Sequence, residues 1–273
     1  MTHNAITHCG QVVREQDRDR FRMSLFEPLS IRPQIWAILA FNHEISKTRE
    51  VVSETQIGHI RLQWWRERLQ EIYNNIPGGW SNHAVLTELA QAVKKHDLPF
   101  NDFDRLIYAR EFDLEDVPPS SIDGLEKYAE FTNLPLSNLM NAIEGANIDD
   151  RCVRDISTGY ALTGLIRSIP YHARQNRVYL PSDLMQKHNV SLSSIVRGTA
   201  GDGLKNVVRT IHDKALALLS YPQSPSLFLD MSQLTALSYL KKIRKSHFDI
   251  YDKRLQNPSF SLFLQLFLKA KCQ

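Results

Sequence analysis

The chain of 273 residues is long enough to bury a large core, and its 23% charged and 42% hydrophobic residues are typical of a soluble globular protein. Its net charge of +3 is too small an excess to indicate a nucleic-acid partner. Cys9, Cys152 and Cys272 form neither a disulfide framework nor a metal-binding knuckle, which excludes a secreted protein stabilised by disulfides.

Apolar residues recur at steps of three and four along most of the chain, which predicts α-helices. Pro33 suits the first turn of a helix, and Pro170 is expected to end one. The expected helices cover residues 32–50, 57–74, 83–96, 100–114, 125–144, 149–169, 182–188, 205–221 and 232–251. The sequence contains neither the alternating pattern of β-strands nor an internal repeat. It therefore predicts an all-α protein with a single domain.

The two ends of the chain are expected to differ from this domain. Residues 1–14 are predicted to be a flexible tail, residues 15–257 the all-α domain, and residues 258–273 an apolar C-terminal segment with lysines at its end. That segment is interpreted as a last helix docked on the core or as an interfacial anchor on anionic lipid. The first twenty residues lack a targeting pattern, and no apolar run approaches the roughly 20 residues that span a bilayer. We expect a protein that is soluble or peripheral on a membrane.

Two stretches resemble the squalene/phytoene synthase family. Residues 36–44 (WAILAFNHE) resemble the helix that carries the family's first aspartate motif. Residues 159–168 (GYALTGLIRS) and 177–181 (RVYLP) resemble the region of the second motif. With weaker matches the resemblance covers roughly residues 15–255. It implies an isoprenoid-synthase-like helical bundle with a central cavity, in agreement with the helical pattern.

The family's enzymes bind prenyl diphosphates through magnesium ions held by acidic residues of two helices, and magnesium requires oxygen ligands. The resemblance places the acids of the first motif at Ser46, Lys47 and Glu50. It places those of the second motif at Ser168, Tyr171 and His172. Only Glu50 is a carboxylate. The resemblance therefore implies no catalytic residue and no metal ligand, and we expect Lys47 to pair with Glu50.

Other family positions keep their residue types, and they allow two interpretations. Arg177 and Tyr179 stabilise the fold at a corner beside the second motif, or Lys47, Arg167, Arg177 and Tyr179 bind an anionic group without metal. A transition-metal site made of His43, Glu50 and His172 is a weaker alternative, because the sequence does not show that these side chains face one another.

The substitutions themselves resemble a non-catalytic branch of the family, which includes mitochondrial assembly factors of respiratory complex I. The resemblance rests on residues 42–44 (NHE), 170–172 (PYH) and 247–251 (HFDIY). It implies a catalytically degenerate protein without cofactor that binds complex I subunits or assembly intermediates, in a bacterial cytoplasm or a mitochondrial matrix. We favour the bacterial cytoplasm, because no transit peptide is visible.

Two alternatives stay open. One is an isoprenoid transferase with an altered metal site, which would need magnesium. The other is a carrier that holds an isoprenoid ligand in the cavity, since an apolar helical cavity suits a prenyl tail.

Overall fold

The computed structural model describes residues 6–76, 78–222, 224–255 and 257–271. Within these ranges the regular structure is helical and contains no β-strand, which confirms the all-α class. The contacts between residues divide the chain into two compact units. The first contains residues up to Glu115, Pro135–Asn147 and Pro225–Phe228, and the second contains Asp116–Leu134, Ile148–Ser224 and the chain from Leu229 onward. The predicted single domain, its boundaries and its central cavity stay predictions.

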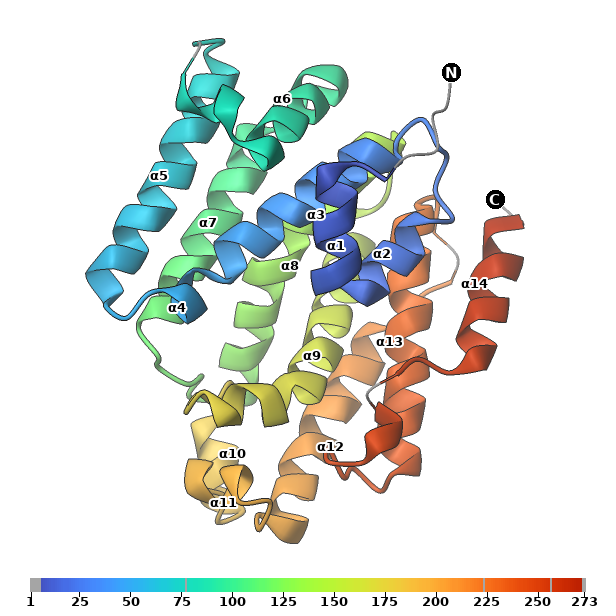
Figure 1. Cartoon of the computed structure of the whole chain (residues 1–273). Coiled ribbons are helices and arrows are strands. Elements are labelled where there is room, and N and C mark those ends of the chain that lie inside the picture. The colour runs from blue at the N-terminus through green and yellow to red at the C-terminus, as the bar shows by residue number, and fades with distance from the viewer. Residues whose placement is uncertain (1–5, 77, 223, 256, 272–273) are drawn as a thin grey trace. The chain divides into compact units, whose positions relative to one another are not determined.

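The first unit is built around helix α3, labelled in Figure 1. Eight of its residues, from Ile35 to Phe41 and Ile45, are buried. Pro33 lies in the first turn of α3, as predicted, where its missing N–H has no partner to lose. Phe41 contacts the rings of Trp65 and Phe103 edge-on, with centroids 5.6 and 5.4 Å apart. The helices of this unit are α1 (His8–Gln16), α2 (Arg18–Ser24), α3 (Arg32–Ser46), α4 (Thr48–Val51), α5 (Thr55–Tyr73), η1 (Gly79–Asn82), α6 (Ala84–His96), α7 (Phe100–Leu114) and the end of α8 (Ile122–Glu144).

The N-terminal residues differ from the expected flexible tail from residue 8 onward. Thr7 caps α1, because its hydroxyl accepts a hydrogen bond from the amide of Gly10. Cys9 and Val13 are buried, and α1 packs against α3. The segment has few apolar residues among many polar ones, so its helical spacing is not recognisable from the sequence. The helix is recognised from its packing.

The second unit is built on the packing of α9 against α12 (Figure 1). Gly159 lies where a Cβ atom would meet Leu219 at 2.7 Å and the carbonyl oxygen of Ala215 at 3.1 Å, so only glycine permits this close approach. The helices of this unit are the start of α8, α9 (Asp150–Arg174), α10 (Ser182–Lys187), α11 (Leu192–Val196), α12 (Gly201–Leu218), nearly all of α13 (Leu227–Lys245), η2 (Lys253–Leu255) and α14 (Phe260–Lys271).

Several helix bounds differ from the prediction. Pro170 lies inside α9, because buried Ile169 and Ala173 hold the helix on both sides of the proline's missing hydrogen bond. The expected helix over residues 32–50 is split at Lys47, beside a hydrogen bond from Ser46 Oγ to the carbonyl oxygen of His43. The helix predicted over 232–251 begins at Leu227 and ends at Lys245.

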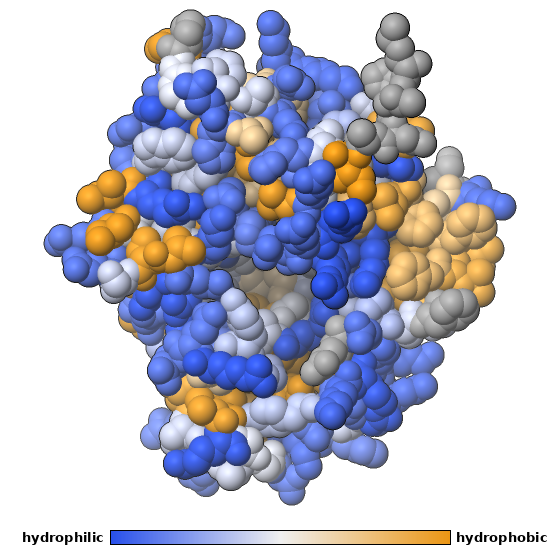
Figure 2. All heavy atoms as spheres, in the orientation of Figure 1, coloured by the Kyte–Doolittle hydropathy of each residue, from blue (hydrophilic) through white to orange (hydrophobic). Residues whose placement is uncertain are grey.

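The C-terminal segment forms α14, and apolar side chains gather on the surface over this helix, at the right of Figure 2. In the described ranges, every helix is too short or too polar to cross a lipid bilayer.

Candidate functional site

The first motif region lies at the end of α3 and on α4, in the first unit. Ser46 is the last residue of α3, Lys47 links the two helices, and Glu50 lies on α4. The Ser46 hydroxyl is already used, because it donates to the carbonyl oxygen of His43 at 3.0 Å. The two positions that resemble the aspartate pair therefore present a hydroxyl turned to its own helix and an ammonium group.

The Lys47 ammonium is held in an ion-pair cluster. Its Nζ atom lies 2.5 Å from Oε1 of Glu44, and Oε2 of the same carboxylate accepts a hydrogen bond from Arg61 Nη2 at 3.0 Å. The Glu44 side chain is only 15% exposed, so both pairs are partly shielded from water. The sequence predicts Glu50 as the partner of Lys47, whereas the structure places Glu44 there, one helical turn earlier.

Two histidines near this cluster have lowered pKa values. Burial is the main cause of the lower pKa of His43, and the positive charge of Lys47 adds to it. Burial likewise lowers the pKa of His83, with Arg61, His8 and Lys47 contributing. Both imidazoles are therefore expected to be neutral at pH 7, which leaves the Glu44 carboxylate to the two cations.

The second motif region occupies the last two turns of α9, in the second unit. Ser168 donates its hydroxyl hydrogen to the carbonyl oxygen of Leu165 at 3.1 Å. Tyr171 is 51% exposed, and its ring lies edge-on to that of His172 with centroids 5.5 Å apart. The positions that resemble the acids of this motif thus hold a hydroxyl and two rings.

An aromatic corner follows the motif. The Tyr179 ring contacts His172 edge-on at 4.8 Å and stacks on Tyr128 at 5.3 Å. Arg177 is 12% exposed and its Nε atom lies 3.4 Å from a carboxylate oxygen of Asp116. These contacts support the interpretation that Arg177 and Tyr179 stabilise the fold, because each is engaged by a side chain of its own unit.

Arg167 lies in different surroundings. Its guanidinium carbon is 3.4 Å from the centroid of the buried Tyr239 ring, a cation–π contact that fixes the cation. Arg167, Tyr171 and Arg174 line a cavity of about 270 Å³ together with residues of the 250–255 segment. The sequence does not single out Arg174, although its position seven residues after Arg167 on α9 is the signal that both can face one cavity.

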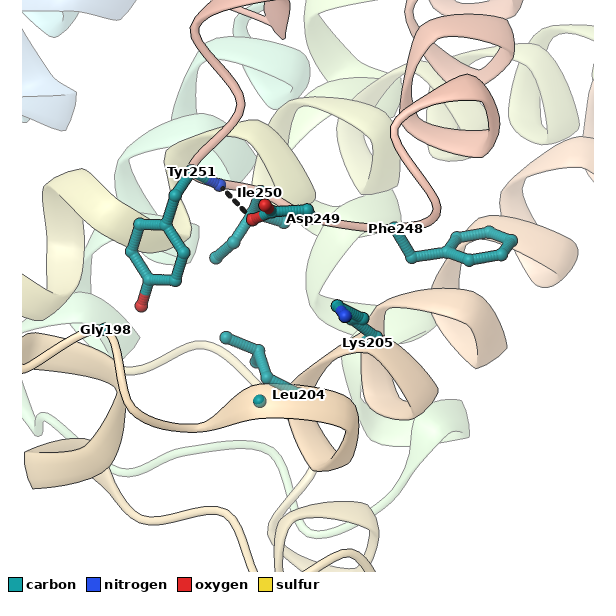
Figure 3. A pocket seen from close by; sticks show the side chains of 8 residues that line it. Gly198, Leu204, Lys205, Phe248, Asp249, Ile250 and Tyr251 are labelled. Carbon is teal, nitrogen blue, oxygen red and sulfur yellow. Dashed lines mark hydrogen bonds between the residues drawn. The ribbon is translucent and has the colours of Figure 1, made fainter.

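A second cavity, of about 420 Å³, lies between the start of α12 and the 248–251 segment (Figure 3). His247 and Phe248 have positive φ angles of 54° and 63°, which turn the chain out of α13 and toward this cavity. The Tyr251 amide donates to Asp249 Oδ1 at 3.0 Å, drawn as the dashed line. Lys205, at the rim, pairs with Asp202 at 2.9 Å, so its charge is balanced within α12.

The residues at the two motif regions do not fit a magnesium ion. Magnesium takes oxygen ligands, chiefly carboxylates, and the structure shows a paired ammonium at Lys47 and rings at Tyr171 and His172. In the described ranges, His, Cys, Asp and Glu side chains do not form a group of three or more that could hold a metal ion. We therefore derive no step through a metal.

The predicted anion-binding set is distributed over both units. Lys47 belongs to the first unit, and Arg167, Arg177 and Tyr179 belong to the second. The structure brings Lys47 to Glu44 and Arg61, and Arg177 to Asp116, whereas Arg167 lines a cavity. The sequence does not reveal the Glu44–Arg61 pair, because the two residues lie on different helices.

The chain is similar to known proteins over nearly its whole length. The family model for squalene/phytoene synthase matches residues 13–261. The chain is 30% identical over 272 residues to "NADH dehydrogenase (ubiquinone) complex I, assembly factor 6" of Bos taurus, covering 96% of this chain and 81% of the relative.

Solved structures show the same fold. Squalene synthase HpnC from Alicyclobacillus acidocaldarius superposes with a TM-score of 0.75 at 20% identity, over 88% of this chain and 93% of that one. A dehydrosqualene synthase superposes with a TM-score of 0.71 at 13% identity, over 97% and 94%. The isoprenoid-synthase-like fold is thereby confirmed, and the chain belongs to the squalene/phytoene synthase family.

Proposed function

We propose that this chain is a catalytically degenerate member of its family that acts in the assembly of respiratory complex I as a binding or scaffolding protein. The observation that carries the proposal is the Glu44–Lys47–Arg61 cluster at the first motif. An ammonium group paired at 2.5 Å with a carboxylate repels a divalent cation, and moving it aside would break its ion pair with Glu44.

The assembly role is supported by the relative from Bos taurus, whose name states that it is a complex I assembly factor. The 30% identity extends over 96% of this chain, so the likeness is to the whole of it and not to one motif. A scaffolding role requires folded surfaces and no metal chemistry, which agrees with the aromatic corner at the second motif. In this proposal the protein needs no cofactor and works in a bacterial cytoplasm or a mitochondrial matrix.

Catalysis is tested with the purified full-length chain, farnesyl or geranylgeranyl diphosphate and magnesium. We expect no release of diphosphate above a reaction without protein, with an active squalene synthase as the positive control. Magnesium-dependent release that disappears in Glu50→Gln would contradict the degenerate site and favour the isoprenoid transferase. Glu50 is the informative position because it is the one carboxylate among the six motif positions.

The assembly role is tested separately in the cell that makes this protein. Deletion of its gene should lower the amount of assembled complex I on native gels and the NADH:quinone oxidoreductase activity, with the other respiratory complexes unchanged. Both the original chain and Glu50→Gln should restore assembly, because the role does not use the motif carboxylate. Normal complex I in the deletion strain would refute the assembly role, whatever the outcome of the diphosphate assay.

For ligand binding without metal, the cavity at Arg167 is the best-supported place. Arg167 and Arg174 offer two guanidinium groups, which suit the oxygens of an anionic head group. We expect inorganic diphosphate to bind the original chain and to bind Arg174→Gln more weakly in isothermal titration. Arg197→Gln is a matched control, since Arg197 is an exposed arginine of the same unit outside this cavity. Equal binding by all three proteins would remove the cavity as an anion site.

A further inference from the structure

Helix α14 has two faces with different surroundings. Leu262 and Leu266 are 3% and 2% exposed, and Lys269 Nζ lies 2.9 Å from Asp230, a carboxylate that is 1% exposed. This face docks the helix on the second unit, as one of the two interpretations of residues 258–273 predicts. Truncation of α14 would therefore remove these leucines, expose the surface that they cover and leave Asp230 without Lys269.

The opposite face of α14 is apolar and open to solvent. Phe263, Leu264, Phe267 and Leu268 are 41%, 57%, 47% and 53% exposed. Their spacing of four residues places them side by side on the helix. Figure 2 shows the apolar surface over this helix. A contiguous apolar patch of this kind is unfavourable in water and marks a surface that contacts something apolar.

A cationic groove of about 560 Å³ lies beside that face, between α13 and α14. Lys241, Lys242 and Lys245 line it from α13, and Arg254 lines it from η2. The Lys242 ammonium is held in place by the carbonyl oxygens of Arg254 and Asn257, at 3.2 and 2.6 Å. Among the described residues, no aspartate or glutamate lines this groove. Arg254 is paired with Asp252, which lies outside the groove lining, so the charge that no lining carboxylate offsets is that of Lys241 and Lys245.

The groove and the apolar face share a border on α14. Ser261 and Gln265 line the groove, and Leu264 and Leu268 follow them by three residues, so they lie beside them on the helix surface. At the C-terminal end of the apolar face, the Lys271 ammonium lies 4.7 Å from the centroid of the Phe267 ring, in a cation–π contact. Positive charges thus border the apolar strip along the groove and at its C-terminal end.

We propose that the α13–α14 surface, defined as the groove at Lys241, Lys242, Lys245 and Arg254 with the exposed face of α14, docks on a membrane of anionic phospholipid. The apolar face enters the boundary between head groups and acyl chains, and the groove receives lipid phosphate. The occupant is identified by charge complementarity: an anionic bilayer offers phosphates at the level of the lysines and hydrocarbon directly below them. Soluble phosphate would leave the apolar face uncovered.

The proposal is independent of the assembly role and is tested by sedimentation of the full chain with vesicles. We expect the protein to bind vesicles of phosphatidylcholine mixed with phosphatidylglycerol, to bind pure phosphatidylcholine more than about tenfold less, and to dissociate in high salt. Equal binding to both vesicles, or to neither, would overturn the proposal. So would binding that soluble glycerol phosphate abolishes at the same phosphate concentration.

Paired variants separate the two parts of the surface. Lys241→Glu with Lys245→Glu should weaken binding more than about tenfold, and Leu264→Ser with Leu268→Ser should also weaken it. Lys187→Glu with Arg197→Glu, at two exposed cations of the second unit outside the groove, is the charge-matched control, and Val51→Ser with Ile60→Ser changes two exposed apolar residues of the first unit. Neither control should change vesicle binding.

Folding and the alternative occupant are covered by two further readouts. The substituted side chains are exposed, so every variant should melt within a few degrees of the original chain. If the variant with two glutamates does not fold, Lys241→Gln with Lys245→Gln is the milder groove variant. If the occupant is an acidic protein instead, the groove variants should bind vesicles as the original chain does and should lose only the binding of that protein. That outcome would overturn the membrane proposal.

Discussion

The two regions that resemble the family's acidic motifs hold physically different groups. At the end of α3, Lys47 and Arg61 share the Glu44 carboxylate in an ion-pair cluster. At the end of α9, the region holds rings, which continue through His172 to Tyr179 and Tyr128. The first region is therefore stabilised by charge and the second by ring packing. Two positions that the resemblance treats alike thus have different chemistry.

The largest expected effect is at the aromatic corner. Tyr179→Ala removes the ring that stacks on Tyr128 and contacts His172, and it should lower the free energy of unfolding by about 3 kcal/mol. Ring packing is not screened by salt, so the loss should be the same at low and high salt. Denaturant unfolding measures this loss of stability. Tyr108→Ala is the control, because the Tyr108 side chain is 47% exposed. A change below that of Tyr108→Ala would show that the corner is not structural.

A smaller loss is expected at the ion-pair cluster. Glu44→Ala leaves Lys47 and Arg61, which are 29% and 31% exposed, without their shared carboxylate. The free energy of unfolding should fall by about 2 kcal/mol at low salt and by less at high salt, since screening weakens the pairs. Glu67→Ala, which removes a 49%-exposed carboxylate from α5, is the control. An effect that does not depend on salt would contradict the electrostatic account of this region.

The first unit contains a further charge-based element that should respond to pH. Burial, together with the neighbouring Glu144, raises the pKa of Glu27 to about 9, and the Glu27 side chain is 1% exposed. The folded chain therefore holds a proton that the unfolded chain releases near pH 4.5. The stability from this proton is complete below pH 4.5 and is lost as the pH rises toward 9.

Glu27→Gln tests that dependence, because an amide keeps the shape without the charge. At pH 5 the variant and the original chain should differ little, and at pH 8 the variant should be more stable by about 1 kcal/mol or more. Thermal melting across this pH range is the measurement. A variant that is destabilised equally at both pH values would show that the carboxyl is not protonated in the folded state.

The smallest expected effect is on catalysis. Lys47→Asp with Ser168→Asp restores one acid in each motif region, yet Tyr171 and His172 still present rings where the resemblance expects carboxylates. The double variant should therefore release no diphosphate from farnesyl diphosphate with magnesium, in the assay described above. Turnover by this variant would mean that two acids suffice and that the second region is less altered than its rings indicate.

Local pattern accounts for most of the fold. The helical periodicity of Ile35, Ile38 and Leu39 predicts a buried face that the structure confirms, whereas Ile60, which the pattern places on the apolar face of the next helix, is 70% exposed. Local pattern also allows Pro170 to be mistaken for a helix end, because the rule that proline ends a helix is local and the packing of Ile169 and Ala173 that overrides it is not. The helix at His8–Gln16 is missed for the same reason.

The site was predictable only in part. The residue types at Ser46, Lys47, Ser168, Tyr171 and His172 can be read directly, and they suffice to argue against a magnesium cluster. The partners of these residues could not be read. Lys47 has carboxylates three residues before and three residues after it, and helix geometry alone permits either one.

The sequence by itself thus determined the helical class and the family, because each depends on residue type at a fixed spacing. The tertiary structure decided that Lys47 pairs with Glu44, since Arg61 arrives from α5 to hold that carboxylate. It also decided that α14 buries Leu262 and Leu266 while it exposes Phe263 and Leu264. Both outcomes depend on contacts between segments far apart in the chain, and local spacing carries no information about which distant side chain comes within reach.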